Sequence, residues 1–238
     1  MDMSTLPRAV ELASFGMRAP RWSPGGPCAL HSEIFAGTRD GSGAGMAVAL
    51  ALDGLPPGDE REVLWVQDAV SIRLTGRPYR PGLPAALRRR LIHVATASCE
   101  DALFALEEAL RCHELACVIG EIAGNPRALD FTASRRLTLT AEKHGVPLFL
   151  VRLDAQRDLS SARLRWQVEA APSPAPRWNA QAPGPPAWRA ELFRSRVHAP
   201  GEWILCNDGQ GLAAERPADT PDHGDLAAAA GDRALAAR

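Results

Sequence analysis

The residues best suited to chemistry form a glycine-rich stretch early in the chain. It contains four glycines in nine positions: Gly37, Gly41, Gly43 and Gly45. A loop of this kind that opens a helix can bind phosphate through its backbone N–H groups. In an ATP-hydrolysing loop, a lysine also contacts the β- and γ-phosphates and a hydroxyl group binds magnesium. Where such a loop has the sequence Gly-Lys-Ser/Thr, this chain has Gly43-Ala44-Gly45, and the only lysine of the chain is Lys143.

Loss of the lysine removes a charge-assisted contact to the phosphates, so we expect no catalytic residue, no ATP hydrolysis and no bound cofactor. Arg39 in the loop and Glu121 at the end of a predicted strand are the remaining candidates for contacting a nucleotide or its metal. The alternative interpretation is a structural loop and a solvated carboxylate beside Asn125. His31 and Glu33 are possible metal ligands, but no second cluster completes a site.

Composition narrows the class of protein. The chain has 238 residues, 46% of them hydrophobic, and a net charge of −1, so its overall field does not favour DNA or a membrane surface. No apolar run approaches the roughly 20 residues that span a bilayer. The amino terminus lacks a signal-peptide pattern. The five cysteines form an odd set without a Cys-x-x-Cys pair, which is typical of a reduced protein. We therefore predict a cytoplasmic location.

Short apolar strands alternate with helices through the first two thirds of the chain. We predict strands at 63–66, 91–95, 115–119 and 146–151, and helices at 46–52, 83–90, after Ser98, and at 132–144. Ser98 and Asp101 resemble a capping box, and Gly145 is placed to end the helix before it. Continuous apolar strands joined by helices predict an α/β fold: a mainly parallel sheet with helices on both faces.

The pattern changes after residue 161. Alternating apolar and polar residues at 162–169 predict a half-exposed strand, and residues 188–197 and 202–206 predict a hairpin. We therefore expect a carboxy-terminal antiparallel β extension, reached through a proline-rich loop at 171–186. The predicted organisation is an amino-terminal arm at 1–27, a core at 28–206 and a disordered tail at 207–238.

The order of these elements resembles the core of RecA recombinases, and more closely the ImuA family of RecA-like proteins from the bacterial SOS mutagenesis cassette. The resemblance covers roughly residues 28 to 206. It rests on the opening segment 30–35, the helix at 101–110, the Thr-Ala-Ser-Arg-Arg-Leu segment at 132–137 and the late Pro-Gly-Glu-Trp at 200–203.

Membership would imply an accessory role in error-prone translesion synthesis. The implied partners are ImuB, which is a catalytically inactive relative of Y-family polymerases, an error-prone DnaE-type polymerase, and RecA. The loops that would contact single-stranded DNA, 122–130 and 153–161, are short and have few arginines, so we expect any DNA contact to be indirect. We predict a non-enzymatic scaffold. The alternatives are a nucleotide-binding ATPase or switch, and an inhibitor of RecA filaments or of cell division.

Partner contacts are predicted in two places. Trp178 and Trp188 flank the proline-rich loop, and tryptophan is enriched at binding hot spots. Arg135 and Arg136 on the last predicted helix could contact an acidic partner or DNA phosphates. The same is true of the Arg88-Arg89-Arg90 run. The alternative for all five arginines is an ordinary helix surface.

Overall fold

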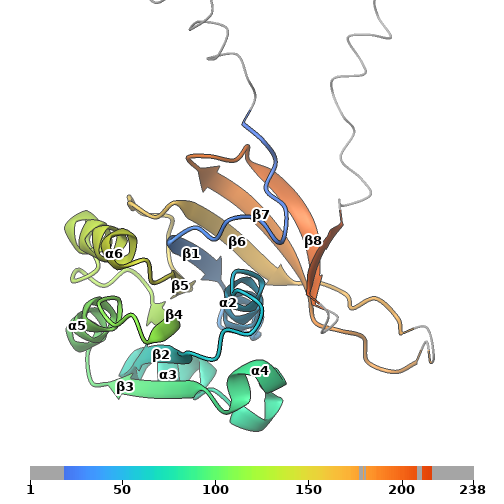
Figure 1. Cartoon of the computed structure of the whole chain (residues 1–238), viewed down its shortest axis with the longest axis horizontal. Coiled ribbons are helices and arrows are strands. Elements are labelled where there is room, and N and C mark those ends of the chain that lie inside the picture. Colours follow the sequence, from blue (N-terminus) through green and yellow to red (C-terminus); the bar gives the residue numbers. More distant parts are fainter. Residues whose placement is uncertain (1–18, 177–178, 180, 208–210, 216–238) are drawn as a thin grey trace, which may run out of the picture.

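The computed structural model describes residues 19–176, 179, 181–207 and 211–215. These residues form a nine-stranded mixed sheet in the order β3-β2-β4-β5-β1-β6-β7-β8-β9 (Figure 1). The strands are β1 His31–Ala36, β2 Glu62–Asp68, β3 Leu91–Thr96, β4 Leu115–Ala123, β5 Leu148–Leu153, β6 Leu164–Ala170, β7 Ala187–Ser195, β8 Gly201–Asn207 and β9 Leu212–Glu215.

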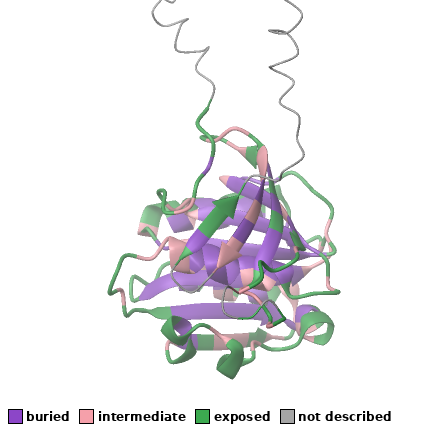
Figure 2. Ribbon diagram, turned by 90° about the vertical axis from the view of Figure 1, so that its right-hand side faces the viewer, coloured by how far each residue is buried: buried purple, intermediate pink, exposed green. Residues whose placement is uncertain are grey.

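The first six strands along the chain pair only in parallel with one another, as predicted for β2, β3, β4 and β5. The sequence predicts a half-exposed strand of the extension at 162–169, whereas β6 also pairs in parallel with β1 and is mostly buried, because it lies between β1 and β7. β1 lies between β5 and β6, with Ile34 opposite both Val151 and Trp166. Figure 2 shows most of these strands coloured as buried. Because β1 is a central strand, the glycine-rich loop that follows it lies near the middle of the row formed by the carboxyl ends of the parallel strands.

Helices cover both faces. They are α2 Ser42–Asp53, α3 Ala69–Thr75, α4 Ala85–Arg88, α5 Cys99–Ala109 and α6 Phe131–His144, with a 3-10 turn at Arg80–Gly82. α2 packs against one face with apolar residues of β1, β5 and β6, whereas α5 and α6 pack against the other (Figure 1). The fold class inferred from the sequence, a mainly parallel α/β sheet with helices on both faces, is confirmed at this level.

Helix ends follow local sequence signals. The Ser98 hydroxyl accepts the Asp101 backbone N–H at 3.1 Å and donates to the Asp101 carboxylate at 2.8 Å, so the predicted residue pair caps α5. α6 ends at Gly145, whose φ of 69° lies in the left-handed region that favours glycine. The unpredicted helix α3 begins because the Asp68 carboxylate accepts the Ser71 N–H at 2.7 Å.

The antiparallel extension forms as predicted, with β6, β7, β8 and β9 paired in sequence. It runs further than expected, because residues 212–215 form β9, although the sequence predicts a tail without structure from 207. The edge of β8 offers unpaired backbone groups, and Leu212 is buried against the core. The expected arm is also partly core: the Trp22 ring lies 4.8 Å from that of Trp166.

Candidate functional site

The glycine-rich loop joins β1 to α2 at the carboxyl end of β1. Helix α2 begins at Ser42, and the Gly45 N–H donates to the Gly41 carbonyl at 2.8 Å. The loop therefore has the strand–loop–helix arrangement that the sequence predicted, and the free N–H groups of the first helical turn lie where a phosphate would bind.

Two carboxylates already occupy this end of the loop. The Ser42 N–H donates to Asp40 at 2.8 Å, and hydrogen bonding to Ser42 holds the pKa of Asp40 below its usual value. Thr38 donates its N–H to Asp154 at 3.2 Å and its hydroxyl at 2.6 Å. The Thr38 and Ser42 donors at this end of the loop are thus bound to negative side chains, which also repel a phosphate.

The glycines of the first turn have packing roles. A Cβ added at Gly43 would lie 2.8 Å from both the Ala36 Cβ and the Val151 Cγ1. A Cβ at Gly45 would lie 3.1 Å from the Trp188 ring. These positions let α2 approach the sheet and the antiparallel extension closely. When the Gly-Lys-Ser/Thr of an ATP-hydrolysing loop is laid on Gly43-Ala44-Gly45, its glycine falls at Gly43 and its lysine at Ala44. No side chain fits at Gly43 without displacing the Ala36 or Val151 side chain.

Gly37, Arg39 and Gly41 are exposed on the loop, as a ligand-binding loop requires. Among the described residues, Arg39 makes no hydrogen bond or ion pair, so its guanidinium is available to solvent. Nothing lies within 4 Å of a Cβ added at Gly41. The loop therefore keeps an open tip above a closed first turn.

Glu121 on β4 is buried rather than solvated. Its carboxylate accepts the Trp65 indole N–H at 2.8 Å and the Thr75 hydroxyl at 3.0 Å. Burial raises the pKa of Glu121 above its usual value. The carboxylate that could have held a metal-bound water instead joins β2, β4 and α3. The nearby Asp68 caps α3, so it too has a structural role.

A groove with a volume of about 1330 Å³ runs beside α2. The glycine-rich loop lies at one end, and the residues after α3 form a further wall. Its lining is mainly apolar and includes Val48, Leu52, Leu74, Leu83, Trp188 and Leu212. Gly41, Gly43 and Gly45 line the groove together with Arg39 and Glu121, whereas Gly37 does not.

Two of the predicted partner residues, Arg135 and Arg136, are separated from this groove, whereas Trp188 lines it. Arg135 and Arg136 are exposed on α6, on the opposite face of the sheet, and Arg136 pairs with Glu107 of α5 at 3.2 Å. The sequence predicts an exposed contact for Trp188, whereas the structure leaves only 5% of it exposed, because its ring packs over Gly45. Trp178 lies outside the described residues.

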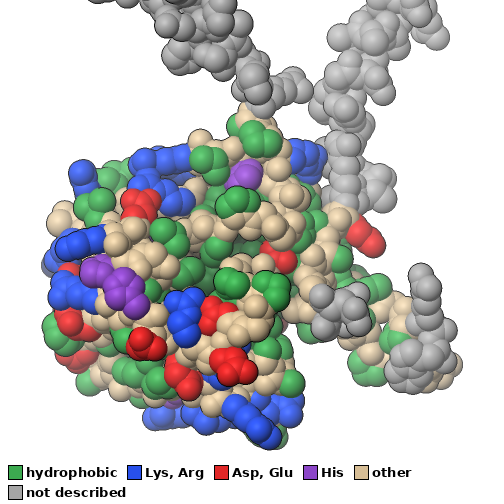
Figure 3. Space-filling model, viewed as in Figure 1, with side chains coloured by type: hydrophobic (Ala, Val, Ile, Leu, Met, Phe, Trp, Pro, Cys, Tyr) green, Lys and Arg blue, Asp and Glu red, His purple; other side chains and the backbone are tan. Residues whose placement is uncertain are grey.

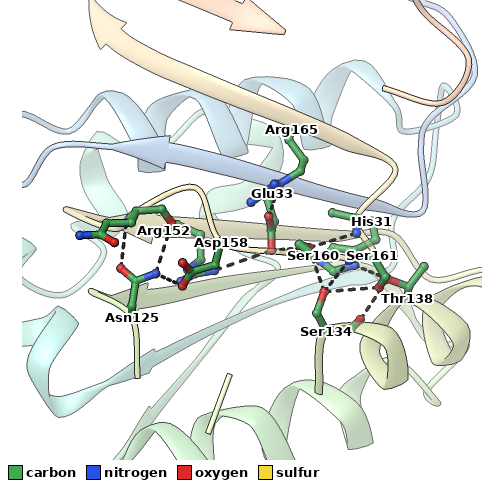
Figure 4. Close-up of polar contacts among 12 residues, drawn as sticks. His31, Glu33, Asn125, Ser134, Thr138, Arg152, Asp158, Ser160, Ser161 and Arg165 are labelled. Atoms are coloured by element: carbon green, nitrogen blue, oxygen red, sulfur yellow. Dashed lines mark hydrogen bonds and ion pairs between the residues drawn. The ribbon is translucent and has the colours of Figure 1, made fainter. Parts of the chain in front are cut away.

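A buried polar network on the α6 side was not predicted. Figure 4 shows Glu33 of β1 between Arg165 and Ser160. The Glu33 carboxylate accepts a hydrogen bond from Arg165 at 2.7 Å and another from the Ser160 hydroxyl at 2.8 Å. The Arg152 guanidinium lies 3.8 Å from the same carboxylate. All three charged side chains are at most 3% exposed. A possible signal is Arg152 inside an otherwise apolar strand, since a buried charge requires a partner.

The same network fixes the two loops that would contact single-stranded DNA in a recombinase. Asn125, after β4, accepts the Gln156 N–H at 2.8 Å and donates to Asp158, both of which follow β5 (Figure 4). Ser160 also bonds Ser134 of α6 at 2.9 Å. The loops are therefore held to each other and to the helix.

The residues considered as metal ligands are internal as well. The His31 ring nitrogen Nδ1 lies 2.7 Å from the Thr138 hydroxyl, and burial lowers the pKa of His31 to about 4. Within the described part of the chain, no group of three or more His, Cys, Asp or Glu residues could hold a metal ion. Burial raises the pKa of Cys28 to about 11 and that of Cys117 to about 12, so these thiols are unreactive.

Fold and site together define a mixed α/β protein with a glycine-rich loop between β1 and α2, in which Thr38 and Ser42 bind the carboxylates of Asp154 and Asp40. No protein-family model matches the chain. It is similar to two curated proteins named Protein ImuA, from Caulobacter vibrioides strains NA1000/CB15N and ATCC 19089/CIP 103742/CB 15. Each is 35% identical over 197 residues, which cover 76% of this chain and 77% of the relative. The chain belongs to the ImuA family, as the sequence motifs indicated.

No helix in the described ranges is long and apolar enough to cross a membrane.

Proposed function

We propose that this protein is a non-enzymatic accessory factor of error-prone DNA synthesis induced by DNA damage, and that it acts in the cytoplasm. Family membership supports the mutagenic role. The observation that carries the non-enzymatic part is the occupation of the phosphate end of the loop by Asp40 and Asp154. Without a lysine in the stretch Gly43-Ala44-Gly45, this arrangement offers a triphosphate no positive partner in the first helical turn.

A RecA-like core is part of this proposal. It is supported by the position of β1 between β5 and β6, by the glycine-rich loop that leads into α2, and by the antiparallel strands after β6. The bonds that hold the loops after β4 and β5 favour protein contacts over filament-type DNA binding, because a loop already bonded to its neighbour has fewer groups to offer a strand.

The partners we propose are ImuB, an error-prone DnaE-type polymerase and RecA. Such a scaffold needs binding surfaces rather than a reaction centre. The large groove beside α2 and the exposed arginines of α6 are two such surfaces, on opposite faces of the sheet.

Two measurements test the proposal. In cells that lack the gene, damage-induced mutation frequency should fall to the uninduced level and return with the wild-type gene. Titration of purified protein at about 100 μM with Mg-ATP should give no binding heat, since that concentration detects even weak affinities. An unchanged mutation frequency would contradict the mutagenic role. Saturable, magnesium-dependent binding would favour a nucleotide-controlled switch instead.

A further inference from the structure

The groove beside α2 has the dimensions of a peptide site. Small-molecule pockets usually have volumes of roughly 300–1,000 Å³, and this groove has about 1330 Å³. It follows α2, whose 12 residues span about 18 Å at 1.5 Å per residue. That length matches about three turns of a second helix. Amphipathic helices bind in apolar grooves of this kind through residues on one face.

The wall of the groove formed after β2 exposes apolar side chains. Leu74 of α3 is 48% exposed and Tyr79 is 74% exposed, and both line the groove. Val70, one turn before Leu74 on the same helix, is 43% exposed. Leu74 and Tyr79 at the groove, with Val70 outside it on the same helix as Leu74, place three exposed large apolar residues within ten positions, which indicates a surface that another chain covers.

The segment that forms this wall is strongly basic, and one of its arginines, Arg77, lines the groove. Residues 69–90 contain six arginines and no Asp or Glu: Arg73, Arg77, Arg80, Arg88, Arg89 and Arg90. The whole chain carries a net charge of −1, so this is a local concentration of positive charge. Figure 3 shows blue side chains along the lower edge of the molecule, where α4 lies in Figure 1.

Three of these arginines donate hydrogen bonds to backbone carbonyls of the same region. Arg80 donates to the Leu91 carbonyl at 2.6 Å, Arg88 to that of Leu83 at 3.1 Å, and Arg90 to that of Ala86 at 2.7 Å. The other three, Arg73, Arg77 and Arg89, are exposed and make no hydrogen bond or ion pair with any described residue. Their guanidinium groups are available to carboxylates of a partner.

The carboxylates of the groove have partners within the chain. Asp40 accepts from Ser42, Asp53 accepts the Gly25 N–H at 2.8 Å, and Glu121 is buried. The positive charge offered to an incoming chain lies on the wall formed by residues 69–90, where Arg77 lines the groove and the exposed Arg73 precedes Leu74. The walls beyond it are aliphatic, which suits leucine-type side chains better than nucleobases, because base binding relies on several aromatic platforms.

We propose that this groove binds an acidic amphipathic segment of a partner protein. The apolar face of the segment lies along α2, and its carboxylates contact Arg73, Arg77 and Arg89. This inference rests on the proposed role as a scaffold and gives that role a specific surface and a specific partner chemistry.

The test uses a fluorescein-labelled helical peptide of about 16 residues, made of Glu, Ala and Leu, with leucines on one face. Fluorescence anisotropy should show saturable binding to the full-length protein. A peptide of identical composition with scattered leucines should bind roughly tenfold more weakly, and one with Lys for Glu should not bind. An oligo(dT) of about 16 nucleotides is tested in parallel.

Arg73→Glu/Arg77→Glu should weaken peptide binding by roughly tenfold or more, and Tyr79→Ala by a few fold. Arg194→Glu, an exposed arginine on β7, is the matched control and should leave binding unchanged. Circular dichroism confirms that each variant is folded.

Failure of the acidic peptide to bind, or binding that the Arg73/Arg77 variant does not weaken, would overturn the inference. Binding of oligo(dT) alone, lost in the same variant, would overturn it in favour of nucleic acid. Neither result affects the gene-deletion test, so the proposed function and this inference can fail separately.

Discussion

Loops at two places along the sheet have opposite designs. The loop after β1 keeps an exposed tip beside a large groove, although its donors bind Asp40 and Asp154. The loops after β4 and β5 are bonded to each other and stand on a buried ionic network around Glu33. The comparison indicates that the loops after β4 and β5 are fixed within the fold, whereas the loop after β1 keeps an accessible surface.

The largest expected effect comes from breaking the fixed region. Glu33→Ala leaves Arg152 and Arg165 buried without their carboxylate. Removing one partner of a buried ion pair typically costs about 3–5 kcal/mol, and we expect a loss of that size in the free energy of unfolding. Urea denaturation measures it. Glu191→Ala removes the exposed pair with Arg157 and should cost less than about 1 kcal/mol. Equal losses would show that the network is not a main support.

The same network makes stability depend on pH through His31. Its pKa is lowered from 6.5 to about 4, so below pH 6.5 the unfolded chain binds a proton that the folded protein does not. The contribution of His31 to the free energy of unfolding is therefore complete above pH 6.5 and is lost as the pH falls towards 4. At 1.36 kcal/mol per pKa unit, the loss reaches about 3 kcal/mol. Unfolding midpoints at successive pH values should show this slope, and His31→Gln should reduce it. An identical slope in the variant would contradict the assignment.

Gly43 tests whether the first turn of α2 is closed by packing. Gly43→Ala places a Cβ 2.8 Å from the Ala36 and Val151 side chains, and overpacking of this kind costs about 1–3 kcal/mol. Gly43→Lys should be at least as destabilising and should not restore ATP binding. Gly41→Ala, where φ is −86° and nothing lies within 4 Å, is the matched control and should change the free energy of unfolding by less than about 0.5 kcal/mol. A stable Gly43→Lys variant that binds ATP would refute the packing role.

The smallest expected effect concerns charge in the loop. Asp40→Asn/Asp154→Asn keeps the side-chain shapes, and asparagine tolerates the positive φ of 47° at residue 154. Removal of the two negative charges should raise affinity for Mg-ATP by a few fold, yet leave it weak, because no lysine is supplied. Titration with a fluorescent ATP analogue compares the variant with the wild type. Strong binding by the wild type would show that the carboxylates do not exclude phosphate.

Much of the fold follows from local sequence signals. Apolar runs predicted the parallel strands, Ser98 and Asp101 the start of α5, and Gly145 the end of α6. Prediction failed where a contact joins distant segments. β9 depends on the free edge of β8, and Trp22 enters the core only because Trp166 and Trp203 surround it. Neither the β8–β9 pairing nor the Trp22 contact can be read from a window of neighbouring residues.

The candidate site divides in the same way. The sequence by itself determined that the loop lacks a lysine, that its glycines open a helix, and that the chain resembles the ImuA family. Only the tertiary structure decided that Gly43 and Gly45 are packing positions, that Asp154 reaches the loop, and that Glu121 is buried beneath Trp65 and Thr75. The physical reason is distance along the chain: Asp154 is 116 residues from Thr38, and such contacts depend on how the strands are ordered in the sheet.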